Sequence, residues 1–191
     1  MNKLKLNTIE LTKFALFGAL MYAQKAVLAS LPNIHLTAVL ITAFTVVYRV
    51  KALYPLLIYV FLEGLFSGFT VWWIPYLYIW PILWGAVMLL PKDLINKKFG
   101  ALIYMLVCSL HGFLFGTLFT PAYALILGMN FEESLAWIAS GLPYDMIHGI
   151  SNFCLGILIV PIIKVLLKLE MNIGATQPEA NAGGKQKETK D

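Results

Sequence analysis

The sequence predicts an all-α integral membrane protein, built as a bundle of six transmembrane helices. Of its 191 residues, 60% are hydrophobic and only 13% are charged, so a soluble domain of this size could not bury its apolar side chains. The apolar residues gather in stretches whose lengths approach what a hydrocarbon core of about 30 Å requires. Lipid offers no hydrogen bonds to a backbone, so these stretches are expected to be helical.

Polar and turn-forming residues divide the chain into the expected spans. These are 9–30, 36–49, 52–71, 75–91, 100–120 and 142–166. The first span is too long for the hydrophobic region of a signal peptide, so we assign it to the bundle. The second has only about 14 residues, and we expect it to be tilted or partly covered by its neighbours.

The distribution of Lys and Arg predicts that both termini lie inside the cell. In that arrangement the inner segments hold all the basic residues but one, namely Lys3, Lys5, Lys13, Arg49, Lys51, Lys92, Lys97, Lys98, Lys164, Lys168, Lys185, Lys187 and Lys190. The outer loops hold none, and Lys25 lies within the first span toward its outer end. Basic residues favour the cytoplasmic side. The net charge of +4 therefore indicates a cytoplasmic collar and not a nucleic-acid surface.

The composition divides the chain into two parts. Residues 1–169 are expected to form the six-helix membrane domain, and residues 170–191 a disordered cytoplasmic tail poor in large apolar side chains. The inner loops are too short to house a nucleotide-binding domain. The longest connection, 121–141, carries Glu132 and Glu133, and it is expected to include a short amphipathic helix that lies at the outer surface or covers the bundle as a lid.

Polar side chains recur inside the expected spans, where a charge costs at least about 2.5–3.5 kcal/mol on insertion scales. Asp145, His148 and Asn152 share one helical face because they are spaced by three and four residues. Asp145 and His148, together with Lys25, Glu63 and His111, fall at or outward of the middle of their spans. This pattern favours a cavity open to the outside. The alternative is a structural polar core, in which Lys25 pairs with Glu63 or Asp145 and the histidines bond backbone carbonyls.

Aromatic residues are concentrated between positions 72 and 84. Some of them are expected to form an ordinary belt at the membrane surface. Trp73, Tyr76, Trp80 and Trp84 lie on nearly one helical stripe and could form a stacking wall for a flat ring. These four residues complete the predicted substrate-binding set.

Small residues spaced by four positions form a row in the first span, at Ala15, Ala19 and Ala23. Shorter rows occur at Gly64 and Gly68 and at Gly112 and Gly116. Such rows let helix backbones approach closely in lipid. Each row fits either packing within the bundle or contact with another membrane protein.

The chain carries no catalytic motif that we recognise. Residues 149–151, GIS, lack the last glycine of a nucleophile elbow and have no strand before them. The histidines and acids do not form an H-E-x-x-H pattern. We therefore expect no enzyme activity, no metal and no cofactor in this chain.

Three stretches resemble the substrate-binding S components of energy-coupling factor (ECF) vitamin importers. They are ALFGALMYA in the first span, LPNIHLTAVLI at the start of the second and GLPYDMIHGISNFCLG in the last, and the resemblance extends over residues 8–168. It implies a pocket, open to the outside, formed by the outer loops and the outer ends of helices four to six. The expected ligand is a water-soluble vitamin or related nutrient, and no motif specifies which one.

The resemblance also implies partners and a location. S components join a membrane coupling subunit and two ATP-hydrolysing subunits, which use the ATP, and they are thought to topple in the bilayer to release substrate. The alanine row is the family's docking surface, which corresponds here to Ala15, Ala19 and Ala23, with Gly18 on a neighbouring strip. The expected location is the plasma membrane of a prokaryote. Two other classes stay open, a self-sufficient carrier or channel and a structural membrane protein without a ligand.

Overall fold

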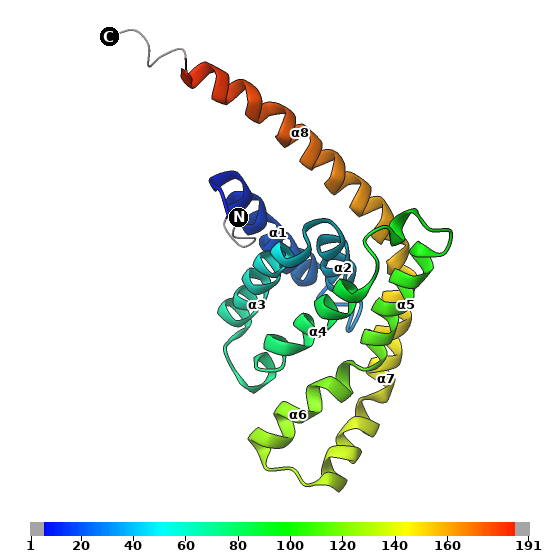
Figure 1. Ribbon diagram of the computed structural model, residues 1–191. Helices are drawn as coiled ribbons and strands as arrows, with labels where there is room; N and C mark the ends of the chain where they lie inside the picture. The colour runs from blue at the N-terminus through cyan, green and yellow to red at the C-terminus, as the bar shows by residue number, and fades with distance from the viewer. Residues whose placement is uncertain (1–5, 186–191) are drawn as a thin grey trace.

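The computed structural model describes the backbone of residues 6–185 and the side chains of residues 6–173. Helices make up nearly all of this part of the chain (Figure 1). The α-helices are α1 (Thr8–Val27), α2 (Thr37–Tyr48), α3 (Leu53–Ser67), α4 (Tyr76–Leu89), α5 (Gly100–Phe113), α6 (Phe115–Leu127), α7 (Phe131–Leu155) and α8 (Ile159–Lys185). Short 3-10 helices occur at Arg49–Ala52, Val71–Trp73, Leu94–Asn96 and Gly156–Leu158.

The protein is all-α, and in the described residues four helical stretches are long and apolar enough to cross a membrane. They are Thr37–Ser67, Val71–Leu89, Gly100–Leu127 and Phe131–Ile173. This number corrects the six that the sequence predicts. The helix α1 is not among them because it carries Glu10, Lys13 and Lys25, and the stretch Thr37–Ser67 joins α2 and α3 into one helical run.

One end of the bundle is held by ion pairs, and we call it the basic end. Lys13 Nζ lies 2.6 Å from a carboxylate oxygen of Glu170, which also accepts a hydrogen bond from the Tyr48 hydroxyl at 2.9 Å. Lys51 Nζ lies 2.6 Å from Glu10. These contacts bring the start of α1, the end of α2 and the middle of α8 together.

Contacts at the far ends of the same helices define the opposite end. Gln24 Nε2 donates to the Thr37 hydroxyl at 3.0 Å, and Lys25 Nζ lies 2.7 Å from Glu63. The chain therefore runs from the basic end in α1, returns in α2 and leaves again in α3. Arg49, with φ of +53°, lies where α2 gives way to α3, so the run Thr37–Ser67 reverses its direction there.

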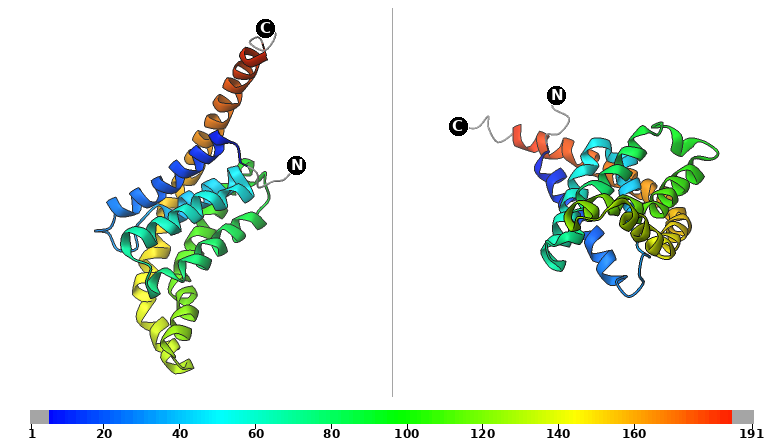
Figure 2. Two further views of the ribbon diagram at one scale, coloured as in Figure 1. Left: turned by 90° about the vertical axis from the view of Figure 1, so that its left-hand side faces the viewer. Right: turned by 90° about the horizontal axis from the view of Figure 1, so that it is seen from below.

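The helix α2 lies in the middle of the bundle. All its residues from Thr37 to Thr45 are buried, so its short length is explained by cover from neighbouring helices. In the two views, α1 lies beside α3, and α5 beside α7 (Figures 1 and 2). The core includes the fully buried Phe14, Tyr59 and Trp80.

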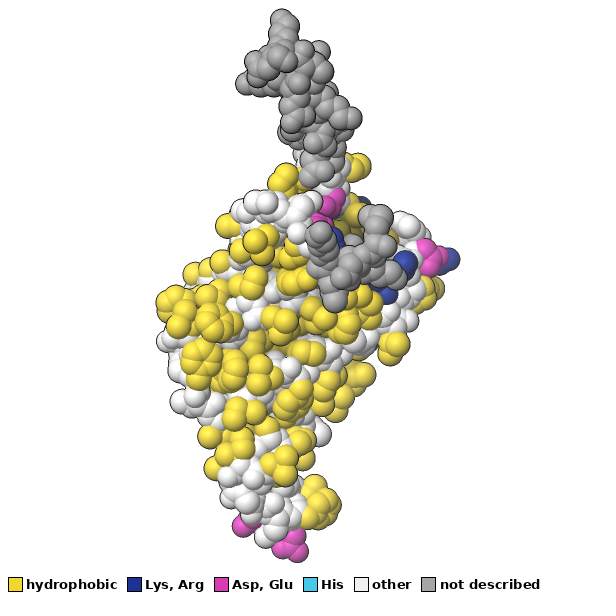
Figure 3. Space-filling view, turned by 60° about the vertical axis from the view of Figure 1, so that its left-hand side comes forward, with side chains coloured by type: hydrophobic (Ala, Val, Ile, Leu, Met, Phe, Trp, Pro, Cys, Tyr) yellow, Lys and Arg dark blue, Asp and Glu magenta, His cyan; other side chains and the backbone are white. Residues whose placement is uncertain are grey.

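The outer surface of the bundle is apolar, as a lipid-facing surface requires. Leu16 and Leu20 of α1 and Phe61 and Phe66 of α3 are each more than half exposed. Figure 3 shows hydrophobic side chains across the middle of this face, whereas acidic side chains gather at the lower tip. These features make a multi-pass membrane protein plausible.

Residues 121–141 form helices and not the long connection with a short separate helix that the sequence predicts. The turn between α6 and α7 spans only residues 128–130, with Gly128 in the left-handed conformation at φ of +69°. Asn130 and Glu133 form a capping box at the start of α7. The two helices project from the bundle as a hairpin (Figure 2).

The backbone beyond Leu169 also differs from the predicted tail. The helix α8 continues to Lys185 and extends away from the bundle (Figures 1 and 2). The predicted disorder at 186–191, with Lys187 and Lys190, lies outside the described residues.

In the connection between α4 and α5, a hydrogen bond from Lys97 lowers the pKa of Asp93, and the same bond raises the pKa of Lys97.

Candidate functional site

A cavity of about 300 Å³ lies at the end of the bundle opposite the basic end. The residues after α1 form much of its wall, and the starts of α4 and α6 supply an aromatic floor. Its lining comprises Lys25, Leu28, Ala29, Leu31, Pro32, Asn33, His35, Tyr76 and Phe115. Ser151 of α7 donates to the carbonyl oxygen of Asn33 at 2.9 Å, which ties this wall to the bundle. The volume suits a ligand of one or two rings.

The charged group at the cavity, Lys25, is already paired. Its Nζ lies 2.7 Å from Glu63 Oε2 and 3.1 Å from the hydroxyl of Tyr76, and it also lies 4.9 Å from the centre of the Tyr76 ring. The Glu63 side chain is only 4% exposed. Of the two pairings that the sequence allowed, the structure forms Lys25 with Glu63 and not with Asp145.

Behind the cavity floor lies a group of buried polar side chains that we call the polar cluster, formed by His35, Trp80, His111, His148 and Asn152. Each of them is at most 9% exposed. Within the side chains that the structure describes, the atoms without a hydrogen-bond partner include His35 Nδ1, Trp80 Nε1, His111 Nδ1, both ring nitrogens of His148 and Asn152 Oδ1. A buried polar atom left without a partner costs about 1–3 kcal/mol. Such a concentration indicates a site made for a ligand or for water.

Ring contacts connect the polar cluster to the cavity. The ring centre of His148 lies 5.1 Å from that of His35 and 4.8 Å from that of Phe115. The Trp80 ring lies 5.7 Å from Tyr76 and 5.5 Å from Phe115. His35, Tyr76 and Phe115 also line the cavity. His35 thus faces the open space itself, and the rings of Trp80, His111 and His148 contact side chains that line it.

The hydrogen bonds that His111 and Asn152 already make determine whether their remaining polar atoms are donors or acceptors. His111 Nε2 contacts the carbonyl oxygen of Ile79 at 3.0 Å and must donate to it, so Nδ1 of a neutral His111 is an acceptor. Asn152 Nδ2 donates to the carbonyl oxygen of Cys108 at 3.3 Å, which leaves Oδ1 as an acceptor. Trp80 offers a donor, and a neutral His148 offers one donor and one acceptor.

The face of α7 that carries these residues packs against α5. A Cβ atom added to Gly112 would lie 2.9 Å from the backbone of Gly149, so side chains on both helices would hold them apart. Ser109 Oγ donates to the carbonyl oxygen of Gly149 at 3.0 Å. This close approach places His148 and Asn152 at the centre of the bundle. The polar face of α7 thus looks inward.

Asp145 lies on the same face but has another environment. Both of its carboxylate oxygens accept from the backbone N–H of Gly116, at 2.9 and 3.1 Å. Gly116 belongs to the first turn of α6, where backbone N–H groups have no partner within the helix. Asp145 therefore caps α6 and does not line the cavity.

Two tryptophans of the predicted stacking wall lie elsewhere. Trp84 Nε1 donates to the carbonyl oxygen of Arg49 at 3.1 Å, toward the basic end. Trp73 Nε1 donates to the carbonyl oxygen of Val60 at 2.7 Å. Because one helical turn advances a side chain by about 5.4 Å along the axis, Trp84 lies one turn beyond Trp80 and farther from the cavity.

Seven of the nine residues that line the cavity were not among those chosen from the sequence, and His35 and Phe115 are the two of these whose rings also contact His148. His35 lies in the motif LPNIHLTAVLI, just before the buried helix α2. An ionisable residue directly before the shortest predicted span, 36–49, was a signal that could have identified His35. Phe115 gave no such signal, because an aromatic residue in an apolar run is ordinary.

The small residues of α1 face two ways. Ala15, Ala19 and Ala23 are exposed, whereas Gly18 is buried against α3. A Cβ atom added to Gly18 would lie 2.5 Å from Ile58 Cγ2. The alanine row thus lies on the outside of the bundle, and Gly18 serves packing within it.

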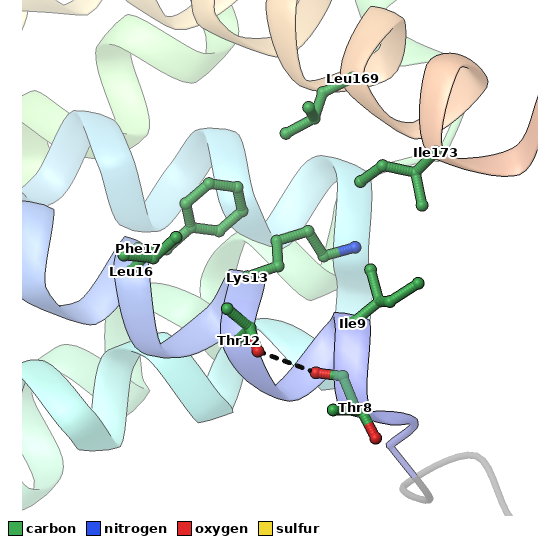
Figure 4. A pocket seen from close by; sticks show the side chains of 8 residues that line it. All are labelled: Thr8, Ile9, Thr12, Lys13, Leu16, Phe17, Leu169 and Ile173. Atoms are coloured by element: carbon green, nitrogen blue, oxygen red, sulfur yellow. Dashed lines mark hydrogen bonds between the residues drawn. The ribbon is translucent and has the colours of Figure 1, made fainter. Parts of the chain in front are cut away.

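A larger cavity, of about 380 Å³, lies at the basic end between α1 and α8. In Figure 4, Leu169 and Ile173 of α8 face Ile9, Lys13 and Phe17 of α1 across it. Its lining is almost wholly apolar, the Lys13 ammonium is paired with Glu170, and Thr12 donates to the carbonyl oxygen of Thr8 at 3.1 Å. It therefore offers few free polar groups to a water-soluble ligand.

In the part of the chain that the structure describes, no three His, Cys, Asp or Glu residues are grouped so that they could hold a metal ion. The described residues form an all-α bundle that has four apolar stretches long enough to cross a membrane and a small cavity above buried polar groups. Comparisons of the chain with models of protein families, with curated proteins and with solved structures give no match.

Proposed function

We propose that this protein captures a vitamin or related micronutrient from outside the cell, as the substrate-binding S component of an ECF-type importer. The observation that carries the proposal is the cavity with the polar cluster directly behind its floor. Groups left unpaired in the ligand-free protein can gain hydrogen bonds when a ligand binds, which favours tight and selective capture.

The direction of the chain supports this proposal. The first turns of α1 and the middle of α8 meet at the basic end, where Lys13 pairs with Glu170. Arg49 and Lys51 are found at this end as well. Basic residues favour the cytoplasm, so the cavity opens to the outside.

The alanine row supports the proposed partner. Ala15, Ala19 and Ala23 are exposed on a helix that otherwise shows large apolar side chains to lipid, such as Leu16 and Leu20. A row of small residues allows another helix to approach closely. In this proposal the row binds the membrane coupling subunit, and two ATP-hydrolysing subunits of the complex supply the energy.

Reconstitution in liposomes tests the proposal. The protein is isolated from native membranes, its bound small molecule is identified by mass spectrometry, and the same molecule is used as a radiolabelled substrate. The protein with the coupling module should accumulate it when ATP is supplied, and the protein alone should bind it without accumulating it. Accumulation by the chain alone would identify a self-sufficient carrier. A protein that binds no small molecule and recruits no module would be structural.

A further inference from the structure

We propose that the ligand of this site is a neutral, planar heterocycle that presents both hydrogen-bond donors and acceptors. This inference rests on the proposed function, because it names the ligand class of the same cavity. It is carried by the way the charges at the cavity are paired and by the kinds of polar atom left unpaired behind its floor.

The pairing of Lys25 argues against a charged ligand. A ligand anion would have to compete with Glu63, whose carboxylate lies 2.7 Å from the Lys25 ammonium. If it succeeded, the Glu63 side chain, only 4% exposed, would be left as an unpaired buried charge. A ligand cation would be repelled by Lys25, which lines the cavity. A neutral ligand leaves the pair intact.

The aromatic surfaces argue for a flat ligand. Tyr76 and Phe115 line the cavity, with ring centres 6.4 Å apart and planes at 76°. His35 adds a third ring to the lining. Aromatic faces gain most from a partner that can stack on them or meet them edge to face.

The unpaired atoms specify what the rim of that ring must offer. Trp80 Nε1 is a donor, whereas His111 Nδ1 and Asn152 Oδ1 are acceptors, and His148 offers one of each. A ligand with donors alone, or with acceptors alone, would leave part of this set unsatisfied. Nitrogen heterocycles with adjacent N–H and C=O groups satisfy both kinds.

Phe115 is the element that must move for the ligand to reach these atoms. Its ring contacts Trp80 at 5.5 Å, His148 at 4.8 Å and His111 at 6.1 Å, and it also lines the cavity. Rotation of this one ring would open the cavity to Trp80, His111 and His148. The ligand ring would then take the place that Phe115 fills in the ligand-free protein.

Two matched pairs of probes test the ligand class. Each pair shares a ring and differs in charge, nicotinamide against nicotinate and uracil against orotate. Binding to the full-length protein in detergent is measured by calorimetry and by thermal unfolding. The neutral member of at least one pair should raise the unfolding temperature by about 5 °C at 100 times its Kd, and should bind at least about tenfold more tightly than its anion.

Two variants assign the binding to this site. His35→Phe keeps a ring in the lining but removes its nitrogens, so it should weaken binding of the neutral probe about tenfold. Tyr78→Phe is the control, because the Tyr78 hydroxyl bonds the carbonyl oxygen of Leu118 away from the cavity, and it should bind as the wild type does.

Three outcomes would overturn the inference about the ligand class. It fails if the anion of either pair binds more tightly, if no neutral probe binds, or if His35→Phe binds the probe unchanged. The proposed function fails separately: a protein that binds a neutral probe but neither joins a coupling module nor supports ATP-dependent uptake keeps the ligand class and loses the transport role. ATP-dependent uptake by a protein that prefers an anion would support the transport role and refute the proposed ligand class.

Discussion

The carboxylate of Asp145 on α7 accepts the backbone N–H of Gly116 at the start of α6, at 2.9 and 3.1 Å. A carboxylate at a helix N-terminus satisfies an N–H group that the helix cannot and also interacts favourably with the helix dipole. This contact crosses between the two helices of the projecting hairpin. Asp145 therefore caps the N-terminus of α6 and does not contact a ligand in the cavity.

Asp145→Ala should therefore loosen α6 without removing a ligand contact. Loss of such a cap costs about 1–2 kcal/mol. Amide hydrogen exchange in the first turn of α6 should accelerate by about tenfold, while Asp145→Asn, which keeps an acceptor, should show a smaller change. Asp93→Ala is the control, since Asp93 pairs with Lys97 on the surface. Unchanged exchange in α6 of Asp145→Ala would contradict the capping role.

The pair of Lys25 and Glu63 leads to a second prediction. Lys25→Met alone should destabilise the protein by about 3 kcal/mol, because it leaves the Glu63 carboxylate buried without its partner. The double variant Lys25→Met with Glu63→Leu should recover most of this loss, since neither charge then remains. Unfolding in mixed micelles measures both changes. A double variant as unstable as the sum of the single ones would show that the pair is not coupled.

The sequence predicted the positions of the helices better than it predicted the number of membrane spans. Helical structure within every predicted span is confirmed, because apolar length and polar interruptions reflect local physics. The count of four apolar stretches follows from the three charged residues of α1, which exclude that helix, and from the continuous helical run of α2 and α3 through Arg49, which no local pattern reveals. Asn130 and Glu133 form the capping box at the start of α7, whereas the acidic residues in this stretch led us to expect a short helix at the outer surface.

The site shows the same division. The spacing of His148 and Asn152 predicted a shared inward face, and both are buried on it. Trp80 and Trp84 also share a helical face by their spacing, yet they have different neighbours in the structure. Helical spacing predicts which residues share a face but not which residues of other helices each turn contacts. The partner of Asp145 lies 29 residues away in the sequence, so only the packing of α6 on α7 could identify it.

The two kinds of small residue on α1 should respond differently to substitution. Ala19→Leu should leave stability and ligand affinity unchanged but reduce recovery of the coupling subunit about tenfold, because a bulky side chain would hold the helices apart. Gly18→Leu should destabilise the protein itself, since even a Cβ atom there would lie 2.5 Å from Ile58.

Gly85→Leu is the matched control for these variants. A Cβ atom at Gly85 meets nothing within 4 Å, so the larger side chain fits without disturbing α4. It should assemble like the wild type in co-purification from membranes that contain the coupling module. Normal assembly of Ala19→Leu would refute the docking role of the alanine row, whereas poor assembly of Gly85→Leu would show that any added bulk interferes.

The last prediction separates a binding site from a structural polar core, and it concerns His148. The side chain is 1% exposed, its ring nitrogens have no partner among the described side chains, and its ring packs against Phe115 and His35. Phenylalanine preserves a ring of similar shape and removes both unpaired nitrogens. His148→Phe should therefore make the ligand-free protein as stable as the wild type or more stable by about 1 kcal/mol.

The same variant should bind the nutrient that co-purifies with the wild type at least about tenfold more weakly, because the ligand loses a donor or an acceptor there. Thermal unfolding of the ligand-free protein and calorimetry with the nutrient measure the two quantities on one preparation. Greater stability together with weaker binding is the signature of polar groups retained for a ligand. A marked loss of stability with unchanged affinity would mean that His148 holds the helices together through partners that water supplies, and the polar cluster would then be a structural core.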